Sequence, residues 1–600
     1  MKTPRKPLQT VWLMLAISWR ADRRRSIAAL VSSSLQLIVL PIRAIGLKLV
    51  ADGVVTHSTS RALVGVGFVV GLTGLNRVMA MVSLTVRMRL RENTQLYLDT
   101  YLMQLTAGVP GIAHHELPEY LDRVELLALE RNELANPFNP ISWTLAAALQ
   151  AVSAMVLLGS VHPLLALVPL AGLPAAVFTA RAHQGARSLL EAQAEETRVL
   201  RHLFDLTTES GPAKEIRLYG LREELLGRRR ATFDRLERSR VAQAVQGALR
   251  TTAAWVFFAV VYCLALAETV RLAQQGRATI GAVVLVLSVG AQLSAQLNDL
   301  AYCVAWFVRT HRAVGRLLWF GEYAERARAA VRPADPAPIP DRLTDGIRLE
   351  DVRFAYSGAG RAVLEHVDLF LPAGKTVAIV GENGAGKTTL VKLHARLYEP
   401  SARRILVDGI DLERFDVDEW RTRISAGFQD FGRFQFVARE SVGIGDLPAA
   451  QSDAHVLAAL DRAAAAELPD DLPAGLATQL GREFDGGTDL SLGQWQKVAL
   501  ARAMMRLAPL LLVLDEPTAS LDAPTEHGLF ERFAAAARDA AAVSGAITIL
   551  VSHRFSTVRM ADLILVISGG RITEAGSHVE LMRRDGLYAE LYELQAAAYR

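Results

Sequence analysis

The sequence predicts a multidomain chain in which an all-α domain of six membrane-spanning helices precedes an α/β domain with a phosphate-binding loop. Three observations lead to this fold class: long apolar runs fill the first half, prolines cluster near residue 336, and a glycine-rich loop follows the short apolar run 376–380. Because 600 residues exceed what one hydrophobic core holds, at least two domains are expected.

Composition excludes several classes of protein. The mean hydropathy of +0.22 is higher than a soluble enzyme usually gives. A net charge of +4 does not suggest nucleic acid as a partner. The two cysteines, Cys263 and Cys303, each lie in an apolar run, so we expect neither a disulfide framework nor a metal site.

The N-terminus does not have the order of a cleaved signal peptide. Residues 10–19 are apolar, and the basic residues Arg20 and 23–25 follow them rather than precede them. A helix lying in the membrane interface, held by these basic residues, fits the pattern better.

A membrane-spanning helix needs about 20 mainly apolar residues. We expect six such spans, at 26–48, 62–86, 141–160, 163–181, 251–271 and 278–299. Arginines crowd the N-terminal segment and the stretch after the second span, whereas 51–61 is nearly uncharged. By the positive-inside rule, the chain should be a multi-pass protein of the cell membrane with both termini cytoplasmic.

Two long polar stretches, 87–140 and 182–250, fall on the cytoplasmic side of this topology and have a helical pattern. We expect them to form helical legs that reach another domain. Within the second, the segment 207–230 breaks at Gly211 and Pro212 and resumes as a short helix.

Some polar residues fall inside the predicted spans, where they are costly. Asn76 and Arg77 lie in the second span, and Gln292, Gln296 and Asp299 share one face of the sixth. They either line a translocation cavity, where Arg77 and Asp299 would pair, or lie at the interface with Arg77 extending to the headgroups.

The stretch 326–346 is expected to be an extended linker, because proline cannot continue a helix. It contains Pro333, Pro336, Pro338 and Pro340. The predicted domains are therefore 1–325 and 347–600.

A phosphate-binding loop is the most specific signal in the second half. TVAIV (376–380) reads as a strand that enters GENGAGKT (381–388), and a helix is expected to follow. Glycines let the backbone amides wrap phosphate groups, the Lys387 ammonium neutralises phosphate charge, and the Thr388 hydroxyl suits Mg²⁺.

Two further apolar runs end in polar residues. LLLVLDE ends in Asp515 and Glu516, and ITILVSH ends in His553. Asp515 can hold Mg²⁺, usually through water, and Glu516 can orient or deprotonate an attacking water. Polar residues at the carboxyl ends of parallel strands indicate a ligand site.

LSLGQWQ (490–496), between these motifs, resembles the signature of ABC ATPases. Residues 341–600 look like an ABC nucleotide-binding domain, and residues 1–325 look like the six-helix domain of ABC exporters. The resemblance implies that ATP is bound with Mg²⁺ and hydrolysed. The ATP-binding residues that the resemblance implies are Tyr356, which would stack on adenine, and Gly381, Glu382, Asn383, Gly384, Ala385, Gly386, Lys387, Thr388, Thr389, Ser491, Gly493 and Gln494. The implied Mg²⁺ ligands are Thr388, Gln429 and Asp515. The implied catalytic residues are Glu516, His553 and Gln429.

The resemblance also implies a half-transporter that works as a dimer, with itself or with a different half. Ser491 and Gly493 would complete an ATP site on the partner, Ser520, Leu521 and Asp522 would cross between subunits, and the short helix in 207–230 would couple to the loop near Gly481. Leu492 stands where the family signature has glycine, and it either slows turnover or points away.

The six predicted spans bear on the rival functions. A soluble ABC ATPase is disfavoured by them, and an importer would normally keep its two domains on separate chains. A lipid flippase and an ATP-dependent membrane sensor stay open as alternatives. IRLYGL, FQDF and GQWQ resemble peptide and lantibiotic half-transporters, which suggests a peptide or hydrophobic small molecule as cargo, although the fold does not determine cargo. No protease domain precedes the spans, so cleavage of a leader by this chain is not expected.

Overall fold

The computed structural model of the chain describes residues 7–136, 138–209, 211–358, 360–517, 523–552 and 554–598. The chain divides into two compact units. The first comprises Met1–Leu105 with Arg123–Glu322, and the second comprises Thr106–Asp122 with Tyr323–Arg600. The second unit therefore includes a short stretch from the N-terminal half, which the sequence assigned to a cytoplasmic leg.

The first unit is built of helices. Its elements are α1 (Pro7–Ala21), α2 (Arg23–Val55), α3 (Thr59–Ala107), α4 (Pro118–Leu134), α5 (Phe138–Gly159), the 3₁₀ helix η2 (Pro163–Gly172), α6 (Leu173–Ala192), α7 (Ala194–Thr208), α8 (Ala213–Leu218), α9 (Arg222–Gln274) and α10 (Ile280–Val331). The last two residues of α3, the last turns of α10 and the start of α4 belong to the second unit.

The predicted spans coincide with these helices to within two residues, and α3, α9 and α10 run far beyond the spans that they contain. The fourth span differs from a regular α-helix, because its first ten residues form η2 with Pro163 at the start and Pro169 inside. Proline lacks the amide that an α-helical turn needs, which favours the tighter 3₁₀ form here. Helix α10 continues six residues into the predicted linker, since the first proline after it is Pro333.

Within the described residues, three helical segments are long and apolar enough to cross a membrane: Thr59–Ala107, Pro163–Ala182 and Arg222–Gln274. Ala147–Gly159 and Ile280–Gly290 are shorter apolar helices. Only 6% of the most apolar window of α3 is buried. Its apolar side chains thus face outward, as those of a helix in lipid do.

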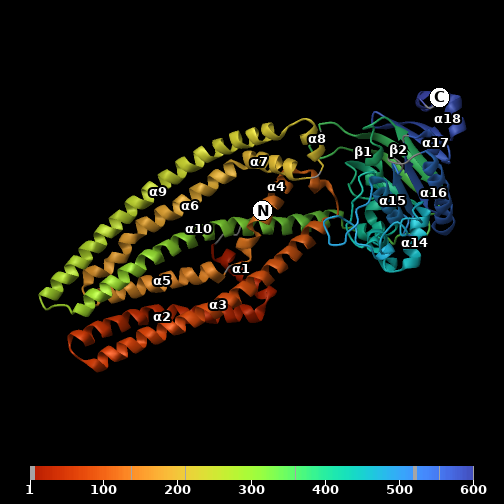
Figure 1. Cartoon of the computed structure of the whole chain (residues 1–600). Helices are drawn as coiled ribbons and strands as arrows, with labels where there is room; N and C mark the ends of the chain where they lie inside the picture. The colour runs from red at the N-terminus through yellow and green to blue at the C-terminus, as the bar shows by residue number, and fades with distance from the viewer. Residues whose placement is uncertain are drawn as a thin grey trace. The chain divides into compact units, whose positions relative to one another are not determined.

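The core of the first unit joins α5, η2, α6, α9 and α10. It contains Leu158, Leu165, Ala176, Phe258 and Leu285 among others. Helices α6 and α9 run side by side over much of their length (Figure 1). Outside this core, Arg316 of α10 donates to both carboxylate oxygens of Glu130 on α4, at 2.6 and 3.0 Å.

The second unit contains two sheets and several helices (Figure 1). Its strands are β1 (Gly346–Phe354), β2 (Leu364–Pro372), β3 (Thr376–Gly381), β4 (Ala402–Val407), β5 (Ile410–Asp411), β6 (Ile424–Gly427), β7 (Leu511–Asp515), β8 (Ile547–Val551), β9 (Leu563–Ser568) and β10 (Arg571–Gly576). Its helices are η1 (Ala113–Glu116), α11 (Lys387–His394), η3 (Leu412–Arg414), α12 (Val417–Thr422), α13 (Ala438–Gly443), η4 (Leu447–Ala449), α14 (Asp453–Arg462), η5 (Gly475–Ala477), α15 (Leu492–Ala503), α16 (Ala523–Ser544), α17 (Phe555–Val558), α18 (His578–Arg584) and α19 (Leu587–Ala598).

The larger sheet positions the motifs found in the sequence. Its strand order is β10-β9-β3-β8-β7-β6, and the pairs from β9 to β6 are parallel. Every residue of β7 and β8 is buried, which explains the continuous apolar runs that the sequence shows there. Because β3, β8 and β7 are neighbours and parallel, their carboxyl ends meet at one edge of the sheet.

Candidate functional site

The loop 381–386 joins β3 to α11, as the sequence predicts. Gly384 and Gly386 have φ angles of 80° and 104°, a region that favours glycine. At Gly386 a Cβ atom would lie 2.7 Å from the Leu364 side chain, so no larger residue fits without a shift. Glu382 and Asn383 are exposed at the tip. The backbone is thus shaped to wrap a small anion.

Lys387 begins α11 and points back into this loop. Its Nζ donates to the carbonyl oxygens of Gly381 and Glu382, at 2.8 and 2.9 Å. Burial lowers the pKa of Lys387, while the carboxylates of Glu516 and Asp515 act in the opposite direction. The loop therefore holds a positive charge at its centre, as phosphate binding requires.

Asp515 ends β7 and is 1% exposed. Among the described residues, neither of its carboxylate oxygens has a hydrogen-bond partner. Burial raises the pKa of Asp515, while the Thr388 and Lys387 side chains lower it. A buried carboxylate with unused lone pairs beside a hydroxyl suits a bound divalent cation, so these residues fit Mg²⁺.

Glu516 follows directly and has an unusual backbone conformation. Its φ angle is 48°, and its amide donates to Val551 O on the neighbouring strand β8, at 2.9 Å. A non-glycine residue in the left-handed region is strained and is kept there only by its surroundings. The strand edge thus fixes where the Glu516 side chain leaves the backbone.

Two other predicted site residues, Tyr356 and Gln429, differ in their burial. Tyr356 is half-buried, and its hydroxyl is hydrogen-bonded to Thr389 Oγ1 of α11 at 2.9 Å. Gln429 follows β6 and is exposed. The structure thus connects Tyr356 to the phosphate loop and leaves Gln429 on the surface.

The signature sequence forms the N-terminus of α15. Ser491 caps this helix: its hydroxyl accepts from the Gln494 amide at 3.2 Å, and its own amide donates to the Gln494 side chain at 2.9 Å. Leu492 is 53% exposed, and Gly493 has open space around its Cα. In the described part of the chain, the Ser491 side chain makes no hydrogen bond to the phosphate loop.

Several predicted residues cannot be placed. His553, Ser520, Leu521 and Asp522 lie outside the described residues, as do the side chains of Gln292 and Gln296. Asp299 and Arg77 are both described and exposed, and no ion pair joins these two side chains. The proposed pairing of Arg77 with Asp299 is therefore absent from this structure.

Sequence reasoning missed one contact with the phosphate-loop domain. The segment Thr106–Asp122 packs in the second unit, where the Ile112 amide donates to Leu397 O at 3.1 Å. Glycine and proline at 108–111 break the long helical pattern and could have indicated a turn. Nothing local, however, identified its partner.

A second missed feature is Arg502 of α15. Its guanidinium donates to Ser441 O at 3.0 Å and to Gly432 O at 3.2 Å, and it lies 4.5 Å from the centre of the Phe434 ring. Burial lowers the pKa of Arg502 to about 10, so it stays charged at neutral pH. Arg502 thus ties the signature helix to the segment that follows Gln429.

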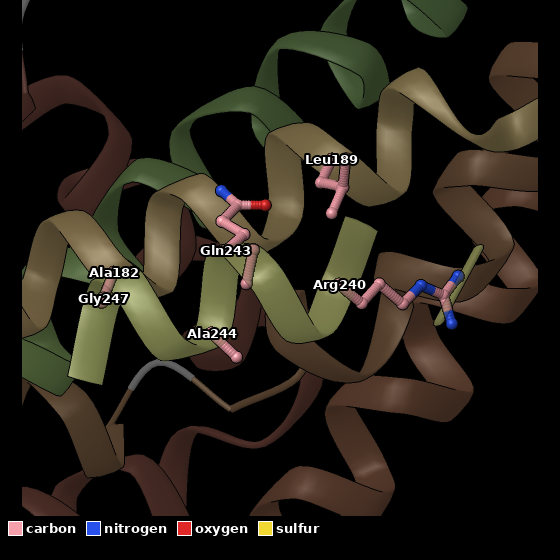
Figure 2. A pocket seen from close by; sticks show the side chains of 7 residues that line it. Ala182, Leu189, Arg240, Gln243, Ala244 and Gly247 are labelled. Carbon is pink, nitrogen blue, oxygen red and sulfur yellow. The ribbon is translucent and has the colours of Figure 1, made fainter. Parts of the chain in front are cut away.

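In the first unit, a cavity of about 250 Å³ lies between α6 and α9 (Figure 2). Small side chains form much of its wall, and Arg240 and Gln243 add polar groups: it is lined by Ala182, Ala186, Leu189, Arg240, Gln243, Ala244 and Gly247. The volume is smaller than the roughly 300–1,000 Å³ of typical ligand sites, so the cavity alone does not identify a substrate.

The fold and the loop define the second unit as a phosphate-loop nucleotide-binding domain. Comparison with known families makes this specific, because the ABC transporter family matches residues 364–519. Those residues form an ABC transporter ATP-binding domain. The signature at 490–496 falls inside the matched range.

Curated relatives agree with this assignment. An ATP-dependent lipid A-core flippase of Ralstonia nicotianae is 41% identical over 268 residues, 44% of each chain. The subtilin transport ATP-binding protein SpaT of Bacillus subtilis is 38% identical over 244 residues, 41% of this chain and 39% of its own. A second lipid A-core flippase, of Cupriavidus metallidurans, is 33% identical over 65% of this chain and 63% of its own. The chain spans about half the length of the curated relatives it matches.

A solved structure extends the likeness to the helical unit. A bacterial Atm1-family ABC exporter with ATP bound superposes with a TM-score of 0.75 and 25% identity, over 96% of this chain and 98% of that one. The chain therefore has the exporter type of ABC transporter fold, a helical transmembrane domain followed by the ATP-binding domain. Its apolar helices are those of a membrane protein.

Proposed function

We propose that the chain is one half of an ATP-driven exporter of the cell membrane, an ATP hydrolase that moves a peptide or hydrophobic small molecule out of the cytoplasm by alternating access. The observation that carries the proposal is the buried Asp515 carboxylate at the strand edge next to Lys387, in a domain that also carries the signature at α15. The outward-facing apolar surface of α3 supports a lipid environment.

In this proposal the phosphate loop holds the phosphates of ATP through its amides and Lys387, and Tyr356 stacks on the base. Thr388, Gln429 and Asp515 would hold Mg²⁺, which when bound neutralises phosphate charge. Glu516 orients the attacking water and accepts its proton, and His553 contacts the terminal phosphate.

The working unit is a dimer, of two copies or of two different halves. The Ser491 hydroxyl and the free amides at the start of α15 are directed to a phosphate of the partner's ATP, which a helix N-terminus favours. The short helix α8 would serve as a coupling helix, and its exposed end, Leu218 at 77% and Tyr219 at 66%, suits a protein contact. Both termini lie in the cytoplasm, and no nucleic acid takes part.

Two kinds of transported molecule, a peptide and a lipid, are candidates for the cargo. The likeness to a subtilin transport protein favours a peptide, and the likeness to lipid A-core flippases favours a lipid. Purified chain in proteoliposomes distinguishes them: a fluorescent peptide should enter the lumen with ATP, or a labelled phospholipid should change leaflet. ATP hydrolysis with neither kind of transport would support the membrane sensor instead and contradict the export proposal.

Glu516→Gln tests the hydrolysis site. Loss of a general base lowers turnover about 10²- to 10⁴-fold, while ATP should still bind. Glu467→Gln, an exposed carboxylate of the same domain, serves as the matched control and should hydrolyse normally. Undiminished hydrolysis by Glu516→Gln would contradict the role given to this residue.

A further inference from the structure

The segment Thr106–Asp122 is anchored within the ATP-binding unit at two places. The Ile112 amide donates to Leu397 O at 3.1 Å, and Arg328 Nε donates to Gly108 O at 2.7 Å. At Gly111 a Cβ atom would lie 3.1 Å from Leu397 O, so the two backbones approach closely. The residue after Leu397 is Tyr398, and this approach brings the segment beside it.

Tyr398 connects this segment to the domain interior. Its ring is buried, at 6% exposure, and its hydroxyl donates to the carboxylate of Glu116, an exposed residue at the end of η1. Burial first, and the Glu116 carboxylate second, raise the pKa of Tyr398 above its usual range. The hydroxyl therefore remains a donor to Glu116 at every practical pH.

The Tyr398 ring in turn contacts Tyr356. The two ring centres lie 5.2 Å apart with an angle of 88° between the planes, and Phe354 lies 4.9 Å from Tyr356 and 5.3 Å from Tyr398. On its other side Tyr356 is hydrogen-bonded to Thr389. The plane of the Tyr356 ring is thus fixed from two directions, by the phosphate loop helix and by Tyr398.

We propose that Glu116 is a positioning residue for the nucleotide base: through Tyr398 it fixes the ring plane of Tyr356. The inference rests on the proposed function, which makes Tyr356 the base-stacking residue. Stacking depends on how two ring planes overlap, so a tilt of Tyr356 weakens binding of the base without touching the phosphates. Because Glu116 lies two residues before α4, movement of that helix would change the affinity for ATP.

The test compares nucleotide binding by the full chain in detergent. All variants carry Glu516→Gln, so that bound nucleotide is not consumed, and calorimetry measures the dissociation constants of ATP and of CTP, which has a smaller base. Glu116→Ala and Tyr398→Phe should each weaken ATP binding about three- to tenfold, the effect of losing part of a hydrogen bond to a charged group. Glu116→Gln keeps an acceptor oxygen and should recover part of the loss.

The comparison of ATP and CTP binding among the variants decides whether Glu116 acts through Tyr398. The double variant should bind ATP no more weakly than the weaker of the two single variants, because both changes remove one interaction. CTP binding should fall clearly less than ATP binding, and Glu119→Ala, another exposed carboxylate of the same segment, should leave both unchanged.

Three results would overturn the inference: unchanged ATP binding in Glu116→Ala, an equal loss for ATP and CTP, or effects of Glu116→Ala and Tyr398→Phe that add. An equal loss would mean that Glu116 only stabilises the domain. If the unaltered chain neither binds nor hydrolyses ATP, the proposed function itself fails. If the unaltered chain hydrolyses ATP and Glu116→Ala binds ATP as tightly as its parent, the role of Glu116 fails while the proposed function stands.

Discussion

Replacement of Arg502 by alanine should loosen the segment that follows Gln429 and lower both stability and turnover. The guanidinium makes two hydrogen bonds to backbone oxygens and covers the Phe434 ring. Ser441 is 0% exposed, so its carbonyl would lose its partner in a dry place, whereas the carbonyl of the exposed Gly432 can turn to water. The hydrogen bond to Ser441 O therefore contributes more to the free energy of unfolding than the one to Gly432 O.

The magnitude follows from these contacts. A hydrogen bond to a charged group contributes about 1.5–3 kcal/mol, and a partly exposed cation–ring contact about 0.5–1 kcal/mol. Arg502 Nη2 is buried and has no hydrogen-bond partner among the described residues, and this desolvation offsets part of the gain. We expect Arg502→Ala to cost about 2–4 kcal/mol, and Arg502→Lys, which can reach one carbonyl, about half of that.

Thermal unfolding and ATP hydrolysis of the solubilised chain measure the effect. At about 2–4 °C per kcal/mol for a domain of this size, Arg502→Ala should melt about 5–15 °C lower. Turnover should fall about tenfold or more, because small displacements of catalytic groups are costly. Arg433→Ala, an exposed arginine of the same segment, is the control. A melting temperature and a turnover for Arg502→Ala equal to those of the control would refute the reasoning.

Three further outcomes are expected from thermal melts. Burial lowers the pKa of His114 to about 4, below its value in the unfolded chain. The free energy of unfolding should therefore be unaffected by His114 above pH 6.5 and should fall as the pH is lowered from 6.5 toward 4. In His114→Phe, the melting temperatures at about pH 5 and about pH 7.5 should lie closer together than in the unaltered chain. Arg316→Met should cost about 3–5 kcal/mol because it removes the arginine of a buried ion pair with Glu130, and adding Glu130→Gln should recover part of this. Asp408→Ala removes the acceptor of three backbone amides and should cost about 1–3 kcal/mol.

The phosphate loop was predictable because its determinants are local. Gly384 and Gly386 are needed by the backbone of the loop itself, and Lys387 bonds to carbonyls five and six residues before it. The same holds for Asp515, since an all-buried parallel strand leaves a continuous apolar run in the sequence. Spacing along the chain therefore carried the information.

Contacts between distant residues were not predictable in this way. Arg502 bonds to residues 61 and 70 positions away, and Tyr398 donates to a residue 282 positions away. A single arginine within a helix, or a tyrosine that follows a helix, looks like an ordinary surface residue in the sequence. The residue that it will contact lies far away and does not affect the local sequence pattern. The assignment of Thr106–Asp122 to the ATP-binding unit depends on the same kind of contact.

The N-terminus of α15 supports the proposal that another chain completes the ATP site. Capping of the helix uses a lone pair of the Ser491 hydroxyl, so its O–H remains free to donate. The first amides of a helix have no partner within it, and here they follow Ser491 at an exposed end where Gly493 leaves open space. Donors gathered in this way suit an anion, and the phosphate loop of the same chain makes no hydrogen bond to Ser491 in the described residues. In that proposal the exposed Leu492 lies at the same contact, which places the residue that departs from the family signature at the interface between the two halves.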